Sequence, residues 1–95
     1  MAFNLPVRLV GYEVRAVREG VSKAGKPYKV IKVEDQEGYD CELSCSDASL
    51  FGAIETLRKG QIINADVRAV SGKDSSYVKL TAAPQLVTNA YDDLD

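Results

Sequence analysis

The fold is decided by the stretch Arg18–Tyr28, which reads REGVSKAGKPY. Gly20, Gly25 and Pro27 disfavour a helix, and valine-rich runs resume on both sides, so the stretch predicts a loop between two strands. The loop brings cations and one ring together with accessible backbone amides. Cations and amides attract phosphate, and an unstacked base packs on a ring. A solvated hairpin carrying ordinary lysines is the alternative interpretation.

Before the loop, residues 7–18 alternate as a strand does, but the alternation changes phase near Gly11. Val7 and Leu9 have one parity, and the next apolar residues have the other: Val10, Tyr12, Val14 and Ala16. A bulge at Gly11 would turn both sets inward and bend a long first strand. Residues 1–6 form an uncharged lead-in that we expect to end at Pro6.

After the loop, residues 28–34 and 39–45 predict the second and third strands, joined by a tight turn at 35–38. Ile31 and Val33 share one face of the second strand, and Tyr28 and Lys32 share the other. In the third strand, the apolar residues alternate with Asp40, Glu42 and Ser44.

The period then changes, and residues 48–58 predict a helix capped by Ser46 or Asp47 and ended by Gly60. Residues 61–70 and 76–82 predict two further strands, joined by the turn 71–75. Pro84 is expected to end regular pairing.

Three strands, one short helix and two strands predict an all-β chain with the five-stranded Greek-key barrel of the OB-fold. An SH3-like barrel or a β-sandwich accommodates nearly as many of the same segments. In OB-folds, oligonucleotides bind one face of the barrel and two of its loops, which here are the basic stretch and the turn at 72–74. The domain is expected to span residues 1–88, followed by an acidic flexible tail at 89–95.

Charge is segregated along the chain, although the net charge is only −2. Residues 8–32 carry seven cations and two acids, residues 33–57 carry seven acids and no cation, and residues 58–88 carry five cations and two acids. A basic surface forms on this acidic protein if the fold joins the first and third blocks.

Several function classes are disfavoured by composition. The chain has no histidine, no phosphate-loop signature and no nucleophile elbow, so we expect neither an enzyme nor a cofactor. Cys41 and Cys45 have no second cysteine pair to complete a metal site and are interpreted as small buried apolar residues. No signal peptide and no run of about 20 apolar residues is present, which favours a cytoplasmic protein that does not enter the membrane.

Residues 20–28, GVSKAGKPY, with Arg18 just before them, resemble the gene V proteins of filamentous phages, which bind single-stranded DNA. The matching core is Ser-x-x-Gly-x-Pro-Tyr, and it lies near the end of the first long strand, as it does in that family. The resemblance covers about a tenth of the chain. This chain is shorter than that family between Tyr28 and Tyr39, and Lys73-Asp74-Ser75 replaces its late hairpin aromatic.

The resemblance implies a homodimeric OB-like domain that coats single-stranded DNA without sequence preference, in replication or transfer of a phage or mobile element. It places Arg18, Lys23, Lys26 and Tyr28 in or beside the DNA groove, with Tyr39 as a second aromatic. The acidic tail is similar in character to those of bacterial single-strand-binding proteins, which implies a replication protein as a further partner.

The full set of candidate contacts combines this resemblance with the outward phase of the strands. Expected phosphate contacts are Arg15, Arg18, Lys23, Lys26, Lys32, Arg68, Lys73 and Lys79, and expected stacking rings are Tyr28, Tyr39 and Tyr77. A protein-interaction barrel and an RNA-binding barrel remain the alternative functions, because nothing in the sequence recognises a 2′-hydroxyl.

Overall fold

Strands dominate the computed structural model, which describes residues 2–73 and 75–88. In chain order the elements are β1 (Phe3–Val21), β2 (Pro27–Glu34), β3 (Asp40–Cys45), a 3₁₀ turn (Ala48–Leu50), α1 (Phe51–Glu55), β4 (Ile62–Ser71), β5 (Ser76–Leu80) and β6 (Gln85–Thr88). The predicted tail at 89–95 and the hairpin residue Asp74 lie outside the described residues.

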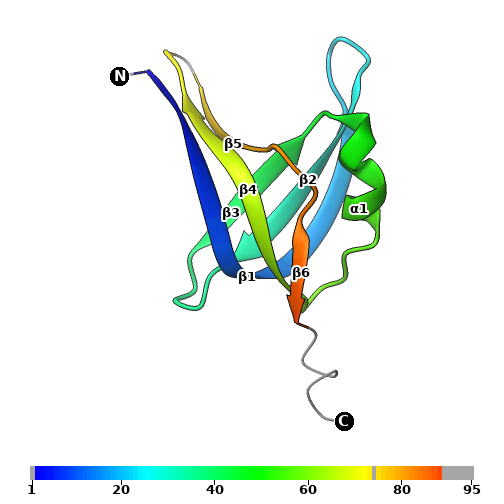
Figure 1. Ribbon diagram of the computed structural model, residues 1–95. Helices are drawn as coiled ribbons and strands as arrows, with labels where there is room; N and C mark the ends of the chain where they lie inside the picture. The colour runs from blue at the N-terminus through cyan, green and yellow to red at the C-terminus, as the bar shows by residue number, and fades with distance from the viewer. Residues whose placement is uncertain (1, 74, 89–95) are drawn as a thin grey trace.

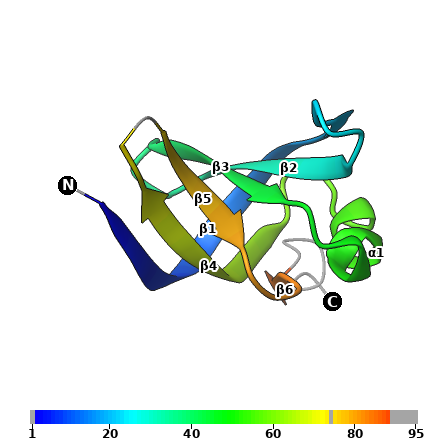
Figure 2. The ribbon, with the colours of Figure 1, turned by 90° about the horizontal axis from the view of Figure 1, so that it is seen from above.

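Five of the strands close into a barrel (Figures 1 and 2). They pair in the order β1-β2-β3-β5-β4, and β4 pairs back with β1. Only β3 and β5 run parallel, and the other neighbours are antiparallel. This closed five-stranded sheet with one short helix is an OB-fold, which confirms the predicted fold class.

The long first strand pairs with two neighbouring strands because it bends at the predicted bulge. Leu9 pairs with Ala65 and Tyr12 with Ile63, so β1 carries one residue more than β4 in this interval. Gly11 adopts φ +73°, and its N–H donates to Asn64 Oδ1 at 3.0 Å. The bulge is therefore confirmed, and it lets β1 leave β4 and continue along β2.

The core confirms most of the inward faces predicted from alternation. Its largest fully buried side chains come from all five barrel strands and α1: Ile31, Leu43, Ile54, Ile63, Leu80, Val14, Val33 and Cys45. Two inward predictions in β1 are wrong, since Val10 is 65% exposed and Val7 is 39% exposed. Val10 lies within the phase change of the bulge, and Val7 lies where β1 pairs with β4 alone.

The predicted helix at 48–58 is too long. A 3₁₀ turn capped by Asp47 leads into α1, which ends at Glu55. Beyond it, Leu57 N–H bonds to Ile54 O at 3.1 Å, and the turn it makes brings the Leu57 side chain into the core. Arg58 N–H then donates to Gln61 Oε1 at 2.7 Å instead of to the Ile54 carbonyl, so the helix does not continue.

Residues 1–6 were expected to be a lead-in ended by Pro6, and Pro84 was expected to end regular pairing; both expectations are wrong, since β1 begins at Phe3 and β6 follows Pro84. Pro6 lies inside β1, opposite Arg68, where β4 is the only described strand beside β1 and the missing N–H is tolerated. Pro84 immediately precedes β6, a four-residue strand that pairs with the start of β4. Figure 1 shows β6 extending along the lower end of the barrel.

Candidate nucleic-acid interface

The β1–β2 loop is a hairpin closed by its own hydrogen bonds. Ser22 N–H donates to Lys26 O at 2.8 Å, Gly25 N–H donates to Ser22 O at 2.9 Å, and Lys26 N–H donates to Ser22 Oγ at 3.2 Å. Gly25 adopts φ +80°, a backbone conformation that a residue with a side chain would adopt only with strain. The loop therefore presents the exposed side chains of Lys23 and Lys26 on a defined frame.

Two predicted rings meet on the barrel surface. Tyr28 of β2 and Tyr77 of β5 line one depression of about 290 Å³, together with Ser44, Cys45, Ser46 and Lys79. Tyr28 is 37% exposed and Tyr77 is 48% exposed. The parallel pairing of β3 with β5 brings them together, and Ser44 Oγ reinforces it by donating to Val78 O at 3.2 Å. Tyr28, Tyr77 and Lys79 are called the tyrosine cluster below.

Cations continue from this cluster toward the β4–β5 hairpin. Lys79 pairs across the sheet with Arg68, which is exposed and donates to Asn4 Oδ1 at 3.2 Å. Lys73 is exposed at the hairpin that joins β4 and β5. In Figure 1 this hairpin lies at the upper left and the β1–β2 loop at the upper right. The tyrosine cluster thus belongs to strands that connect two cationic ends.

Three other predicted phosphate contacts form ion pairs with carboxylates of β1, β2 and β3. Arg18 forms an ion pair with Glu42, and Lys32 lies 3.6 Å from Asp40. Arg15 lies 2.7 Å from Glu13 and 3.4 Å from Glu34. The hydrogen bond to Glu13, with the charges of Glu13 and Glu34, raises the pKa of the Arg15 guanidinium. Within the described residues, no such ion pair involves Lys23, Lys26, Arg68, Lys73 or Lys79.

Tyr39 does not join the tyrosine cluster. It is 71% exposed and precedes β3, at the turn where Asp35 accepts its N–H at 2.9 Å. Tyr28 lies at the other end of β2, about 24 Å away at 3.4 Å per residue, since Tyr39 lies opposite Asp35. The surroundings of Tyr39 are acidic, with Asp35, Glu37 and Asp40 nearby in the chain.

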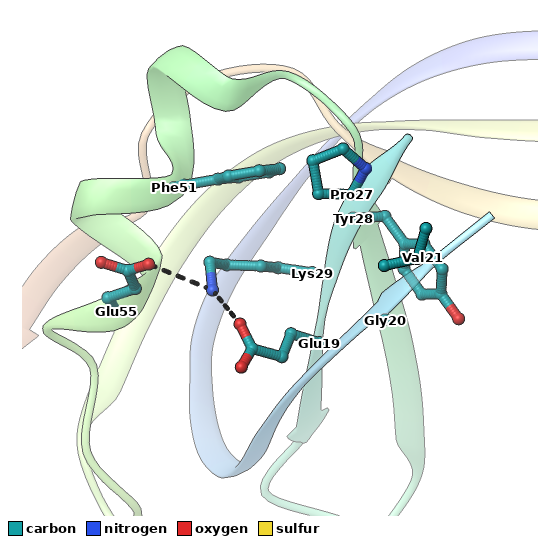
Figure 3. Close-up of a pocket in the computed structure, with 8 residues that line it drawn as sticks. All are labelled: Glu19, Gly20, Val21, Pro27, Tyr28, Lys29, Phe51 and Glu55. Carbon is teal, nitrogen blue, oxygen red and sulfur yellow. Dashed lines mark hydrogen bonds and ion pairs between the residues drawn. The ribbon is translucent and has the colours of Figure 1, made fainter. Parts of the chain in front are cut away.

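Sequence reasoning missed a second depression of about 380 Å³ on the other side of β2, between the β1–β2 ribbon and α1 (Figure 3). Lys29 Nζ lies 2.9 Å from Glu19, 3.1 Å from Glu55 and 5.4 Å from the Phe51 ring centroid. Hydrogen bonds to the two carboxylates raise the pKa of Lys29 although burial opposes them. Lys29 shares the parity of Ile31 and Val33, and that signal could have identified it as inward-facing.

The remaining groups offer little chemistry of their own. Cys45 is buried as expected, and the half-buried Cys41 has its thiol pKa raised, first by burial and then by Asp40 and Glu42. Across residues 2–73 and 75–88, no group of three metal-ligating side chains gathers. No helix in the same ranges is long and apolar enough to cross a membrane.

The fold and this surface define a small OB-fold domain whose exposed face combines rings with cations. No family model and no curated protein sequence matches the chain. Among solved structures, the mitochondrial single-stranded DNA-binding protein Rim1 of S. cerevisiae aligns with TM-score 0.73 at 14% identity, over 90% of this chain and 96% of that chain. A small single-stranded DNA-binding protein from Streptomyces coelicolor aligns with TM-score 0.59 at 11% identity, over 88% and 93% of the two chains. At these identities the comparison establishes a shared fold.

Proposed function

We propose that this protein is a non-enzymatic, single-stranded DNA-binding protein that binds without sequence preference. The observation that carries the proposal is the tyrosine cluster, in which two half-exposed rings and a lysine share one depression on an OB-fold barrel. Similarity of fold to two proteins named for single-stranded DNA binding supports it, as does the resemblance of residues 18–28 to the gene V proteins.

The chemistry of the tyrosine cluster suits binding of a nucleic-acid strand without recognition of its base sequence. Every base has a π-face, and stacking on an aromatic side chain contributes about 1–3 kcal/mol per base. Lys79 lies beside both rings and supplies a positive charge for the adjoining phosphate. Since the contacts are ring faces and a point charge, they discriminate weakly among bases.

Phosphate contacts fall into two groups on this account. In the part of the chain that the structure describes, no carboxylate pairs with Lys23, Lys26, Lys73, Lys79 or Arg68, whereas Arg15, Arg18 and Lys32 must first exchange a carboxylate for a phosphate. If the first five engage, the logarithm of the binding constant falls with log salt at a slope of about −3.5. Tyr39 lies among carboxylates and is the least favoured of the predicted rings.

The biological setting follows from the same resemblance. Coating and protection of single strands during replication or transfer of a phage or mobile element fits a gene V-like role in the cytoplasm. A replication protein is the proposed partner of the tail, Asn89–Asp95, which carries three acids.

A homodimer is part of the proposal, and β1 provides a surface for it. Among residues 2–73 and 75–88, β2 pairs with β1 only from Glu13 onward, so the earlier part of β1 has β4 on one side and no described strand on the other. Along this part, Phe3, Leu5 and Val7 are 42%, 54% and 39% exposed. We call these three residues the apolar stripe. A two-fold axis makes both the edge and the stripe self-complementary, as an isologous contact requires.

Fluorescence anisotropy with a labelled deoxythymidine oligomer, at several salt concentrations, tests the function. The wild type is compared with a Tyr28→Ala, Lys26→Ala variant and with a Tyr39→Ala, Lys59→Ala control, which removes one tyrosine and one lysine elsewhere. We expect tight, salt-sensitive binding that the first pair abolishes and the control pair keeps. A folded wild type that does not bind at low salt contradicts the proposal and favours a protein-interaction barrel. Tighter binding to a uridine oligomer favours RNA.

A further inference from the structure

Gly20 of β1 lies directly opposite Tyr28 of β2. A β-carbon built on Gly20 would be 2.6 Å from the Tyr28 hydroxyl oxygen, 2.7 Å from Cζ and 3.1 Å from Cε1. Contacts this short are far inside van der Waals distance, so the phenol end of the ring occupies the space that a side chain at position 20 would take. Figure 3 shows the Tyr28 ring beside the backbone of Gly20.

Backbone geometry does not explain the glycine. The positive-φ glycines of the described residues are Gly11, Gly25, Gly38 and Gly60, and Gly20 is not among them. Its backbone is that of an ordinary strand residue, which a β-branched side chain would suit better than glycine. What Gly20 supplies is room for the ring across the ladder, as aromatic residues often use glycine in a neighbouring strand.

The ring so placed borders both depressions of the surface. On one side Tyr28 lines the depression shared with Tyr77 and Lys79, and on the other it lines the depression shared with Phe51 and Lys29. A ring lifted away from β1 would change its angle to Tyr77 and Lys79 together.

We propose that Gly20 is a positioning residue for the Tyr28 ring, and this inference rests on the proposed function. Without a β-carbon at position 20, the ring lies across β1 and is held at the angle in which a base can stack on it beside Tyr77. Gly20 touches no nucleotide itself and acts through Tyr28.

The inference predicts a binding defect with a particular signature. Gly20→Ala weakens binding of a deoxythymidine oligomer by about five- to a hundredfold, the range for one stacked base. The slope of affinity against log salt stays unchanged, because no phosphate contact is removed. A mere folding defect differs, since it lowers the fraction of active protein in a stoichiometric titration and leaves the Kd of the folded fraction as it was.

A double-mutant cycle with Tyr28→Ala tests the mechanism. In the Tyr28→Ala background no ring remains to be displaced, so adding Gly20→Ala changes the Kd by less than about twofold. Gly52→Ala is the matched control, because a β-carbon there meets nothing within 4 Å, and it is expected to bind as the wild type does. Circular dichroism establishes that each variant is folded.

The outcomes separate this inference from the function on which it rests. Wild-type affinity in Gly20→Ala, or an equal loss in the presence and absence of the Tyr28 ring, overturns the positioning role while the DNA-binding function stands. A wild type that fails to bind the oligomer overturns the function and the positioning role together. The positioning role is supported if Gly20→Ala lowers the affinity only in the background that retains Tyr28 and leaves the salt slope unchanged.

Discussion

Individual side chains on the proposed DNA face differ in how readily they can meet a phosphate. An arginine already paired with a carboxylate gains less from a phosphate, since one ion pair replaces another. Arg18 is in this position, because Glu42 of β3 reaches it across the sheet. Under the proposed function, Glu42 therefore competes with the nucleic acid for Arg18.

Neutralising Glu42 should strengthen binding, an uncommon direction for a substitution. We expect Glu42→Gln to raise affinity for single-stranded DNA and to steepen the salt slope by about 0.7, the value of one added phosphate contact. Glu37→Gln is the control, since it makes the same charge change at an exposed residue for which the described residues provide no ion pair. If anisotropy shows an equal gain in affinity for both variants, the change in net charge explains the gain, and competition by Glu42 does not.

The two outer tyrosines should differ although both are exposed. Tyr77→Ala removes a ring of the tyrosine cluster and is expected to weaken binding by about five- to a hundredfold. Tyr39→Ala removes a ring that is more exposed but lies apart, and we expect little change. Titration of both variants with the same oligomer compares their affinities. A larger loss of affinity in Tyr39→Ala would indicate that the DNA binds near the β2–β3 turn.

At the scale of elements, Lys29 connects the β1–β2 ribbon to α1 through Glu19 and Glu55. These carboxylates raise the folded-state pKa of Lys29 above its ordinary value of 10.5. A raised lysine pKa means that the contribution to stability is complete below pH 10.5 and is lost as the pH rises through the folded-state value.

Because the pKa of Lys29 is raised, the stabilising effect of its ion pairs with Glu19 and Glu55 can be tested at alkaline pH. Lys29→Met keeps an unbranched side chain without the charge, and we expect it to lower Tm by a constant amount up to about pH 10. Above that pH the difference between wild type and variant should shrink. A difference that stays constant to pH 12 would show that the ion pairs do not stabilise the folded state.

Elements were predictable from sequence where a single period governs them. The second to fifth strands follow the alternation of Ile31 with Val33 or Val78 with Leu80, because a half-buried strand leaves a two-residue repeat. The end of α1 was not predictable, since it depends on the hydrogen bond by which Gln61 Oε1 accepts the Arg58 N–H. β6 has only four residues and follows a proline, which leaves no repeat to detect.

The site was predictable only in part, because its assembly depends on register between distant strands. The outward phase of Tyr28 and Tyr77 could be read from alternation, but their meeting in one depression requires the parallel pairing of Ser44 with Lys79. The pairing of Arg18 with Glu42 likewise requires three strands in register. Sequence supplied the residues, and the closed barrel determines which of them are neighbours.

For the whole molecule, the apolar stripe on β1 predicts self-association. Leu5→Glu places a charge in the middle of the stripe and should convert a dimer to a monomer in sedimentation equilibrium. Leu86→Glu on β6 is the matched control, since Leu86 is 51% exposed against 54% for Leu5. A short oligomer that fills one binding site should bind both variants alike. A wild type that sediments as a monomer at all concentrations would contradict the proposed dimer.

The same half of β1 has a consequence for synthesis of the protein. Phe3 leaves the ribosome well before Ser71, its partner in the sheet. At about 5–20 residues per second, the segment waits about 3 to 14 seconds for that partner to be made. The β1–β2–β3 meander can form in that time, but the barrel cannot close before β4 arrives. Until then an apolar strand is open to premature aggregation, so the yield of folded protein depends on how fast the chain from Phe3 to Ser71 is translated.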